Sequence, residues 1–137
     1  MPTKKSLSII KIGGKIIDNP TELAQFLTDF SKIEGNKILV HGGGKSATKM
    51  AQSLGLTPQM IDGRRITDQS MLDVVVMIYA GEINKNIVAQ LQANATNAIG
   101  FSGADGNLIQ SSKRNHPTID YGFVGDVQKV NTVLVET

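Results

Sequence analysis

The chain has 137 residues, of which 40% are hydrophobic and 19% are charged, so it is long and apolar enough to fold as one domain around a buried core. A net charge of +2, with no long basic run and only four Phe and two Tyr, argues against a nucleic-acid-binding surface. The lack of cysteine excludes disulfides and thiolate metal sites, and no apolar run suits a signal peptide or a membrane span, so we expect a cytoplasmic protein without nucleic-acid or membrane partners.

The first part of the chain predicts a strand, a helix and a second strand. Residues 7–12 read as an Ile-rich buried strand, and Asn19-Pro20 is a typical helix start, with Asn as the N-cap and Pro in the first turn. Apolar residues at helical spacing follow until Gly35, and residues 37–41 read as the second strand. We therefore expect a βαβ unit with two parallel strands.

The middle of the chain is predicted to be mainly helical. Residues 46–54 fit a short amphipathic helix, and residues 57–66 are expected to be irregular. A helix over residues 67–80 is expected to begin with a Thr N-cap and to end where Gly81 breaks the pattern. Residues 82–94 then predict a further helix.

The last part of the chain returns to strands. Residues 97–101 predict a third core strand, and residues 107–112 and 123–130 predict a hairpin. A final helix is expected to start at Thr132. These elements predict an α/β fold, a three-layer sandwich with a mostly parallel central sheet and a peripheral β-hairpin.

Two glycine-rich turns follow the two strands of the βαβ unit, Gly13-Gly14 after the first and residues 42–44 after the second. Glycine lets a ligand approach the main chain closely, and a turn that opens a helix directs free N–H groups at an anion. Lys11 interrupts the apolar first strand at the sheet edge where parallel folds bind ligands, and Lys45 lies beside the second turn. The pattern predicts a phosphate site at two neighbouring strand ends.

Two nucleotide-binding motifs are partly matched by the second turn. Residues 44–46 resemble the end of a P-loop, but the first glycine of that motif would have to stand at Leu39, so a P-loop is excluded. Residues 42–47 fit the dinucleotide fingerprint G-x-G-x-x-A, although they follow the second strand rather than the first. NAD binding is therefore kept as an alternative.

Simpler interpretations of the candidate residues also stay open. Gly13-Gly14 could be a plain tight turn, and Lys11 could lay its stem on the core with its ammonium in water. Of Arg64 and Arg65, one could hold a carboxylate through two parallel hydrogen bonds, or both could be solvated. No cluster of His, Asp and Glu has metal-ligand spacing, so no metal site is expected.

Six blocks of the sequence follow one another along almost the whole chain. They are Lys11-Ile12-Gly13-Gly14, His41-Gly42-Gly43-Gly44, Gly63-Arg64-Arg65-Ile66-Thr67, Ala80-Gly81-Glu82-Ile83-Asn84-Lys85, Gly100-Phe101-Ser102-Gly103-Ala104-Asp105-Gly106 and Gly122-Phe123-Val124-Gly125-Asp126-Val127. In this order the blocks resemble the acetylglutamate kinases of the amino-acid kinase superfamily. The resemblance implies phosphorylation of the side-chain carboxylate of N-acetyl-L-glutamate by ATP with Mg²⁺, the second step of arginine biosynthesis.

The resemblance also implies a role for each candidate residue. The implied contacts are Lys11 with the transferring phosphoryl group, Gly13 and Gly14 with ATP phosphate, Gly43 and Gly44 with the amino-acid substrate, and Arg65 with its α-carboxylate. A carboxylate nucleophile, with a reference pKa of about 4.3, is already ionised at neutral pH, so no general base is required. Backbone N–H groups and a lysine then suffice to neutralise the charge that develops.

Members of this family have a second lobe with most of the ATP site, and none of its motifs is recognised here. We therefore expect residues 1–137 to be the N-terminal, amino-acid-binding lobe without the C-terminal nucleotide-binding lobe, with little or no kinase activity alone. The resemblance further implies a homodimer. The alternatives are an aspartate- or glutamate-phosphorylating relative and a non-catalytic acylglutamate-binding module, and the sequence leaves open whether the acyl group is acetyl or succinyl.

Overall fold

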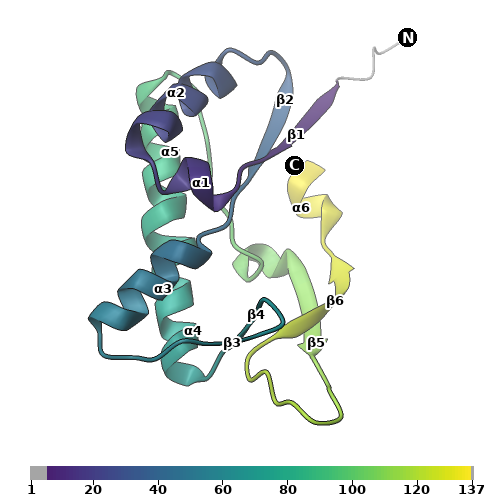
Figure 1. Ribbon diagram of the computed structural model, residues 1–137. Coiled ribbons are helices and arrows are strands. Elements are labelled where there is room, and N and C mark those ends of the chain that lie inside the picture. The colour runs from purple at the N-terminus through teal and green to yellow at the C-terminus, as the bar shows by residue number, and fades with distance from the viewer. Residues whose placement is uncertain (1–5, 137) are drawn as a thin grey trace.

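The computed structural model describes residues 6–136. Its elements, in chain order, are β1 Leu7–Lys11, α1 Gly14–Ile17, α2 Pro20–Ser31, β2 Asn36–Val40, α3 Gly44–Ser53, β3 Gln59–Ile61, β4 Arg64–Ile66, α4 Gln69–Val75, the π-helix η1 Val76–Ile83, α5 Asn84–Ala93, the 3₁₀ turn η2 Asp105–Asn107, β5 Ile109–Lys113, β6 Gly125–Val130 and α6 Thr132–Glu136. Figure 1 shows β1 and β2 beside α2 and α5 at one end, with the β3–β4 hairpin near α4 at the other and the β5–β6 hairpin beyond it.

The predicted βαβ unit is confirmed. β1 and β2 pair in parallel with Lys11 opposite Val40, and α2 connects them. α2 begins as expected, because the Asn19 side chain accepts hydrogen bonds from the backbone N–H groups of Thr21 and Glu22. The parallel register brings the turns after β1 and β2 to the same edge of the sheet.

β1 is covered on one face, whereas the sequence predicts a buried strand. Its burial alternates, with Ile10 partly buried and the following Ile12 only 2% exposed, while Leu7 and Ile9 are 51% and 65% exposed. Successive residues of a strand point to opposite faces, so the described helices cover the Ile10 side. The face that carries Leu7 and Ile9 is apolar and exposed.

α4, η1 and α5 form one continuous helical rod, so the predicted break at Gly81 is wrong. The rod starts one residue later than expected, because the side chain of Asp68 accepts a hydrogen bond from the Met71 N–H at 2.8 Å and forms the N-cap. The i→i+5 pattern of the π-helix keeps Ile78 and Ile83 on one side, where an α-helix would turn one of them away. Gly81 is accommodated within that wider turn.

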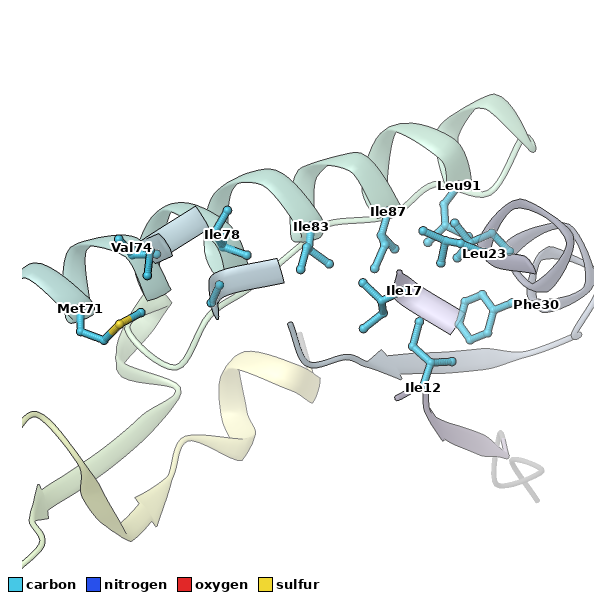
Figure 2. Close-up of a cluster of buried hydrophobic side chains, with 13 residues drawn as sticks. Ile12, Ile17, Leu23, Phe30, Met71, Val74, Ile78, Ile83, Ile87 and Leu91 are labelled. Atoms are coloured by element: carbon cyan, nitrogen blue, oxygen red, sulfur yellow. The ribbon is translucent and has the colours of Figure 1, made fainter. Parts of the chain in front are cut away.

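The core lies between this rod and the first part of the chain. Figure 2 shows apolar side chains along one side of the rod and others from α1, α2 and the residue after β1 that face them. The labelled residues are Met71, Val74, Ile78, Ile83, Ile87 and Leu91 on the rod, and Ile12, Ile17, Leu23 and Phe30 opposite.

Two segments differ from the sequence predictions. Residues 97–101 join no sheet within the described part of the chain; instead the carbonyls of Ala98 and Gly100 accept hydrogen bonds from the side chains of Gln92 and Lys85 on α5. The predicted third core strand is therefore wrong. These side chains supply part of the backbone pairing that a neighbouring strand would otherwise provide.

The predicted irregular segment 57–66 is a second difference, because it contains the antiparallel hairpin β3–β4. Its turn residues Asp62 and Gly63 have φ angles of 49° and 75°. Left-handed conformations at both central positions are typical of a type I′ hairpin turn, for which Asp-Gly is a favoured sequence. The turn thus joins two strands that the sequence analysis did not recognise.

The predicted hairpin is confirmed as β5–β6, with an irregularity between Gln110 and Ser111. The loop that joins its strands is docked on the residue after β4. The N–H of Thr67 donates to the Tyr121 carbonyl at 2.9 Å, and the N–H of Phe123 donates to the Thr67 carbonyl at 2.7 Å. The final helix is also confirmed, as α6.

Candidate functional site

Both glycine turns open a helix at the same edge of the β1–β2 sheet. Gly13 is the N-cap of α1 and Gly43 is the N-cap of α3, and neither helix receives a side-chain cap from any described residue. The first N–H groups of a helix have no partner within it, so both turns offer backbone donors to an anion. Lys11, the last residue of β1, is exposed beside them.

Gly43 is held in place by side chains from the π-helix. A Cβ atom at this position would lie 2.6 Å from Cδ1 of Ile83 and 2.9 Å from Cδ1 of Tyr79. A Cβ atom on the neighbouring Gly42 would meet no described atom within 4 Å. Close packing against η1 therefore requires a glycine at position 43, and not at position 42.

Arg65 of β4 reaches across to the second glycine turn. Its Nη2 donates to the Gly44 carbonyl at 3.0 Å and to the Thr48 hydroxyl at 2.8 Å. Its Nη1 is buried and has no hydrogen-bond partner among residues 6–136. A buried donor without a partner is costly, so an acceptor such as a carboxylate that reached this nitrogen would be bound favourably.

An open groove of about 460 Å³ lies beside this arginine. Its lining residues are Gly44, Lys45, Thr48, Lys49, Met60 and Arg65. Three of these side chains are cationic, and this lining contains no carboxylate. The charge of the groove therefore favours an anionic ligand, and Met60 adds apolar surface.

A short polar link joins the helices that follow the two glycine turns. The Ser46 hydroxyl on α3 donates to Oδ1 of Asp18, the C-cap of α1, at 3.1 Å. The other carboxylate oxygen of Asp18 is buried with no partner among the described residues, 3.7 Å from where a Cβ of Gly14 would lie. This link connects the two turns through their helices.

A second polar network supports the turn from the α5 side. Asn84 is only 7% exposed; its Nδ2 lies 3.1 Å from Nε2 of His41, and its Oδ1 accepts from the Lys85 ammonium at 3.0 Å. Because the ammonium requires an acceptor, the amide must donate to His41. Nδ1 of the ring then carries the proton and donates to the Gly42 carbonyl at 2.9 Å. This is a structural role for His41.

The structure brings together some of the residues predicted from the sequence. Gly44, at the start of α3, and Arg65, on β4, are joined by a direct hydrogen bond. The remaining four lie at the carboxyl edge of the β1–β2 pair, where no ligand contact tests their roles: Lys11, Gly13, Gly14 and Gly43.

Sequence reasoning missed the residues that support these groups. Thr48 lies one helical turn after Gly44, and Tyr79 belongs to a helix that the sequence divides at Gly81. Nothing in their spacing indicates a contact with the site. Asn84 lies within a block of the family resemblance, and that is its only sequence signal.

The described residues contain neither a metal-binding cluster nor a membrane-spanning helix. No group of three or more His, Asp or Glu in residues 6–136 is arranged to hold a metal ion. No helix in that same part of the chain is long and apolar enough to cross a membrane.

Comparison with known proteins indicates the family of this chain. Residues 6–137 match the amino acid kinase family. A protein from Phocaeicola vulgatus named acetylglutamate kinase is 59% identical over 128 residues, which make up 93% of this chain and 50% of that protein. A protein of the same name from Cytophaga hutchinsonii is 60% identical over 128 residues, 93% of this chain and 48% of that protein. The chain thus spans about half the length of the curated relatives it matches.

The fold has a counterpart among solved structures. N-acetylglutamate synthase from Neisseria gonorrhoeae, in a crystal structure with coenzyme A and N-acetyl-glutamate, matches with a TM-score of 0.76 at 20% identity, over 96% of this chain and 30% of that one. At that identity the likeness shows the fold alone, and it confirms the predicted α/β class. Since the family match covers nearly every residue, the chain belongs to the amino-acid kinase family.

Proposed function

We propose that this chain is the amino-acid-binding part of an enzyme that phosphorylates the side-chain carboxylate of N-acetyl-L-glutamate with ATP, a step of arginine biosynthesis. The carrying observation is Arg65, whose Nη2 is fixed by Gly44 and Thr48 while its buried Nη1 has no partner among the described residues. The groove beside it carries further positive charge from Lys45 and Lys49. The relatives named acetylglutamate kinase supply the substrate class.

The proposed chemistry divides between two neighbouring sets of groups. Arg65 and the N–H groups at the start of α3 hold the α-carboxylate of the substrate. Lys11, at the end of β1, neutralises charge on the transferring phosphoryl group. Because the side-chain carboxylate is already ionised, these residues need only position it and stabilise the developing charge.

The first glycine turn fits a phosphate group. A Cβ on Gly13 would meet no described atom within 4 Å, so the main chain at Gly13 leaves room for a ligand. ATP with Mg²⁺, when bound, supplies the phosphoryl group. No cluster of acidic residues between residues 6 and 136 is arranged to hold a metal ion.

Three further points belong to this proposal. The chain spans about half of its relatives' length, so we propose that it needs the nucleotide-binding lobe for turnover. We also propose that it acts in the cytoplasm as a homodimer, for which the exposed apolar Leu7 and Ile9 offer contact surface. Light scattering on the purified protein tests the dimer.

Titration calorimetry with N-acetyl-L-glutamate tests the substrate. Arg65→Ala should weaken binding by about 10- to 100-fold, because a hydrogen bond to a charged group contributes about 1.5–3 kcal/mol. Arg64→Ala is the matched control, since Arg64 is the exposed neighbour in the same strand and should leave the affinity unchanged.

Three outcomes would contradict the proposal. Absence of saturable binding, both by this chain and by a chain that includes the second lobe, would remove N-acetyl-L-glutamate as the substrate. Tighter binding of L-aspartate or L-glutamate would place the chain with another amino-acid kinase. Binding without phosphate transfer, once the second lobe is included, would leave a non-catalytic acylglutamate-binding module.

A further inference from the structure

We propose that Thr48 is the positioning residue for Arg65, so that this threonine sets the affinity of the groove for the α-carboxylate of its ligand. The inference rests on the proposed function and deepens it. Thr48 has no side-chain role in the family resemblance noted above. Its place on α3, one turn after Gly44, brings its hydroxyl between the helix start and the arginine.

The Thr48 hydroxyl acts both as a hydrogen-bond donor and as a hydrogen-bond acceptor. It donates to the Gly44 carbonyl at 2.9 Å and accepts from Nη2 of Arg65 at 2.8 Å. Nη2 also donates to that same carbonyl at 3.0 Å. The carbonyl, the hydroxyl and the guanidinium thus form a closed set of three hydrogen bonds that fixes one nitrogen of the fork.

This arrangement decides which nitrogen of Arg65 is left for the ligand. With both hydrogens of Nη2 directed at Gly44 and Thr48, Nη1 is the buried nitrogen without a partner among the residues that the structure describes. A guanidinium is planar, so fixing Nη2 also fixes the direction of Nη1. An acceptor that reaches Nη1 therefore meets a pre-ordered donor and does not have to immobilise the side chain itself.

Thr48→Val tests the proposal, because valine keeps the shape of threonine and removes the hydroxyl. Ordering one flexible side chain costs about 0.5–1.5 kcal/mol, so N-acetyl-L-glutamate should bind about 3- to 10-fold more weakly. Thr48→Ser restores the hydroxyl and should return the affinity to within about twofold of wild type.

Thr28→Val is the matched control for loss of a helical threonine hydroxyl. Thr28 on α2 also donates to the carbonyl four residues earlier, Ala24, at 2.9 Å, and it is exposed. This variant should bind as wild type does. If Thr28→Val weakened binding as much as Thr48→Val does, the effect would come from the loss of any helical threonine hydroxyl, and the proposal would be overturned.

A double-mutant cycle separates positioning from direct contact. If Thr48 acts only through Arg65, Thr48→Val should change affinity less than twofold in an Arg65→Ala background. An undiminished effect in that background would overturn the proposal. So would wild-type affinity of Thr48→Val itself.

A ligand-free readout keeps this inference distinct from the proposed function. Nitrogen-15 NMR of the Arg65 guanidinium should show hindered exchange of its Nη protons in the wild type and faster, averaged signals in Thr48→Val. That result with no N-acetyl-L-glutamate binding would overturn the substrate alone. Equal Arg65 signals in the folded wild type and variant would overturn the role of Thr48.

Discussion

Gly43→Ala should destabilise the chain, whereas Gly42→Ala should not. Gly43 has a φ of 167°, outside the left-handed region that favours glycine, so the expected cost is steric. The added methyl would lie 2.6 Å from Ile83 Cδ1 and within 3.0 Å of two carbons of the Tyr79 ring. These atoms belong to η1, and Ile83 is only 7% exposed, so neither side chain can move away without disturbing the core.

The magnitude follows from overpacking a well-filled site. One inserted methyl that forces neighbours to shift costs about 1–3 kcal/mol. A domain of this size loses about 4 °C of melting temperature for each kcal/mol, so Gly43→Ala should melt about 4–12 °C below the wild type. Gly42→Ala, whose methyl meets no described atom within 4 Å, should melt within about 2 °C of it.

Thermal unfolding followed by circular dichroism measures the difference between the two variants. Calorimetry on the same samples should show weaker ligand binding by Gly43→Ala, because the turn that presents Gly44 would shift. Equal melting temperatures for both variants would refute the reasoning. That result would mean that η1 does not pack against the turn as closely as the structure describes.

Two further predictions concern the hairpins. Gly63→Ala should lower the free energy of unfolding by about 1–2 kcal/mol, because Gly63 has a φ of 75° that L-residues adopt only with strain. Gly55→Ala is the control, because Gly55 has a φ of 77° and equally open space around it, and it should cost a similar amount. Only Gly63→Ala should also weaken ligand binding, since it alters the hairpin that carries Arg65. Equal ligand affinities of the two variants would contradict this prediction. In β5–β6, hydrogen bonds from Arg114 lower the pKa of Asp126. A carboxyl group with a lower pKa in the folded state stabilises that state above the unfolded pKa of about 3.9, and the contribution disappears as the pH falls through the folded value. Unfolding of the wild type should therefore become easier below about pH 4, and Arg114→Ala should lessen this dependence; identical pH profiles would count against the pair.

The sequence by itself determined the local elements whose signals are contained in neighbouring residues. Asn19 before a proline fixed the start of α2, because a side-chain acceptor and a preset φ favour a helix wherever it packs. The glycine turns could also be located from the sequence, since they follow apolar strands at the edge where parallel sheets bind ligands. The residue blocks further indicated the family.

The tertiary structure decided the features that depend on residues far apart in the chain. Propensity at Gly81 indicates a break, yet packing of Ile78 and Ile83 on the same core carries the helix through it as a π-helix. Residues 97–101 have the composition of a strand but no neighbouring strand within residues 6–136, so side chains of α5 hold their carbonyls instead. Composition sets how readily a segment can extend, whereas pairing requires a partner that only the fold supplies.

The contact between Arg65 and the turn at Gly44 illustrates the same division. The sequence identifies an arginine in a loop-like segment and a glycine turn 21 positions earlier, and neither signal contains the distance between them. The hairpin β3–β4 and the helix α3 bring Nη2 of Arg65 within 3.0 Å of the Gly44 carbonyl. Residue types therefore determined the chemistry available to this protein, and tertiary packing decided which nitrogen of Arg65 is left free to bind, because hydrogen-bond geometry is set only when distant elements meet.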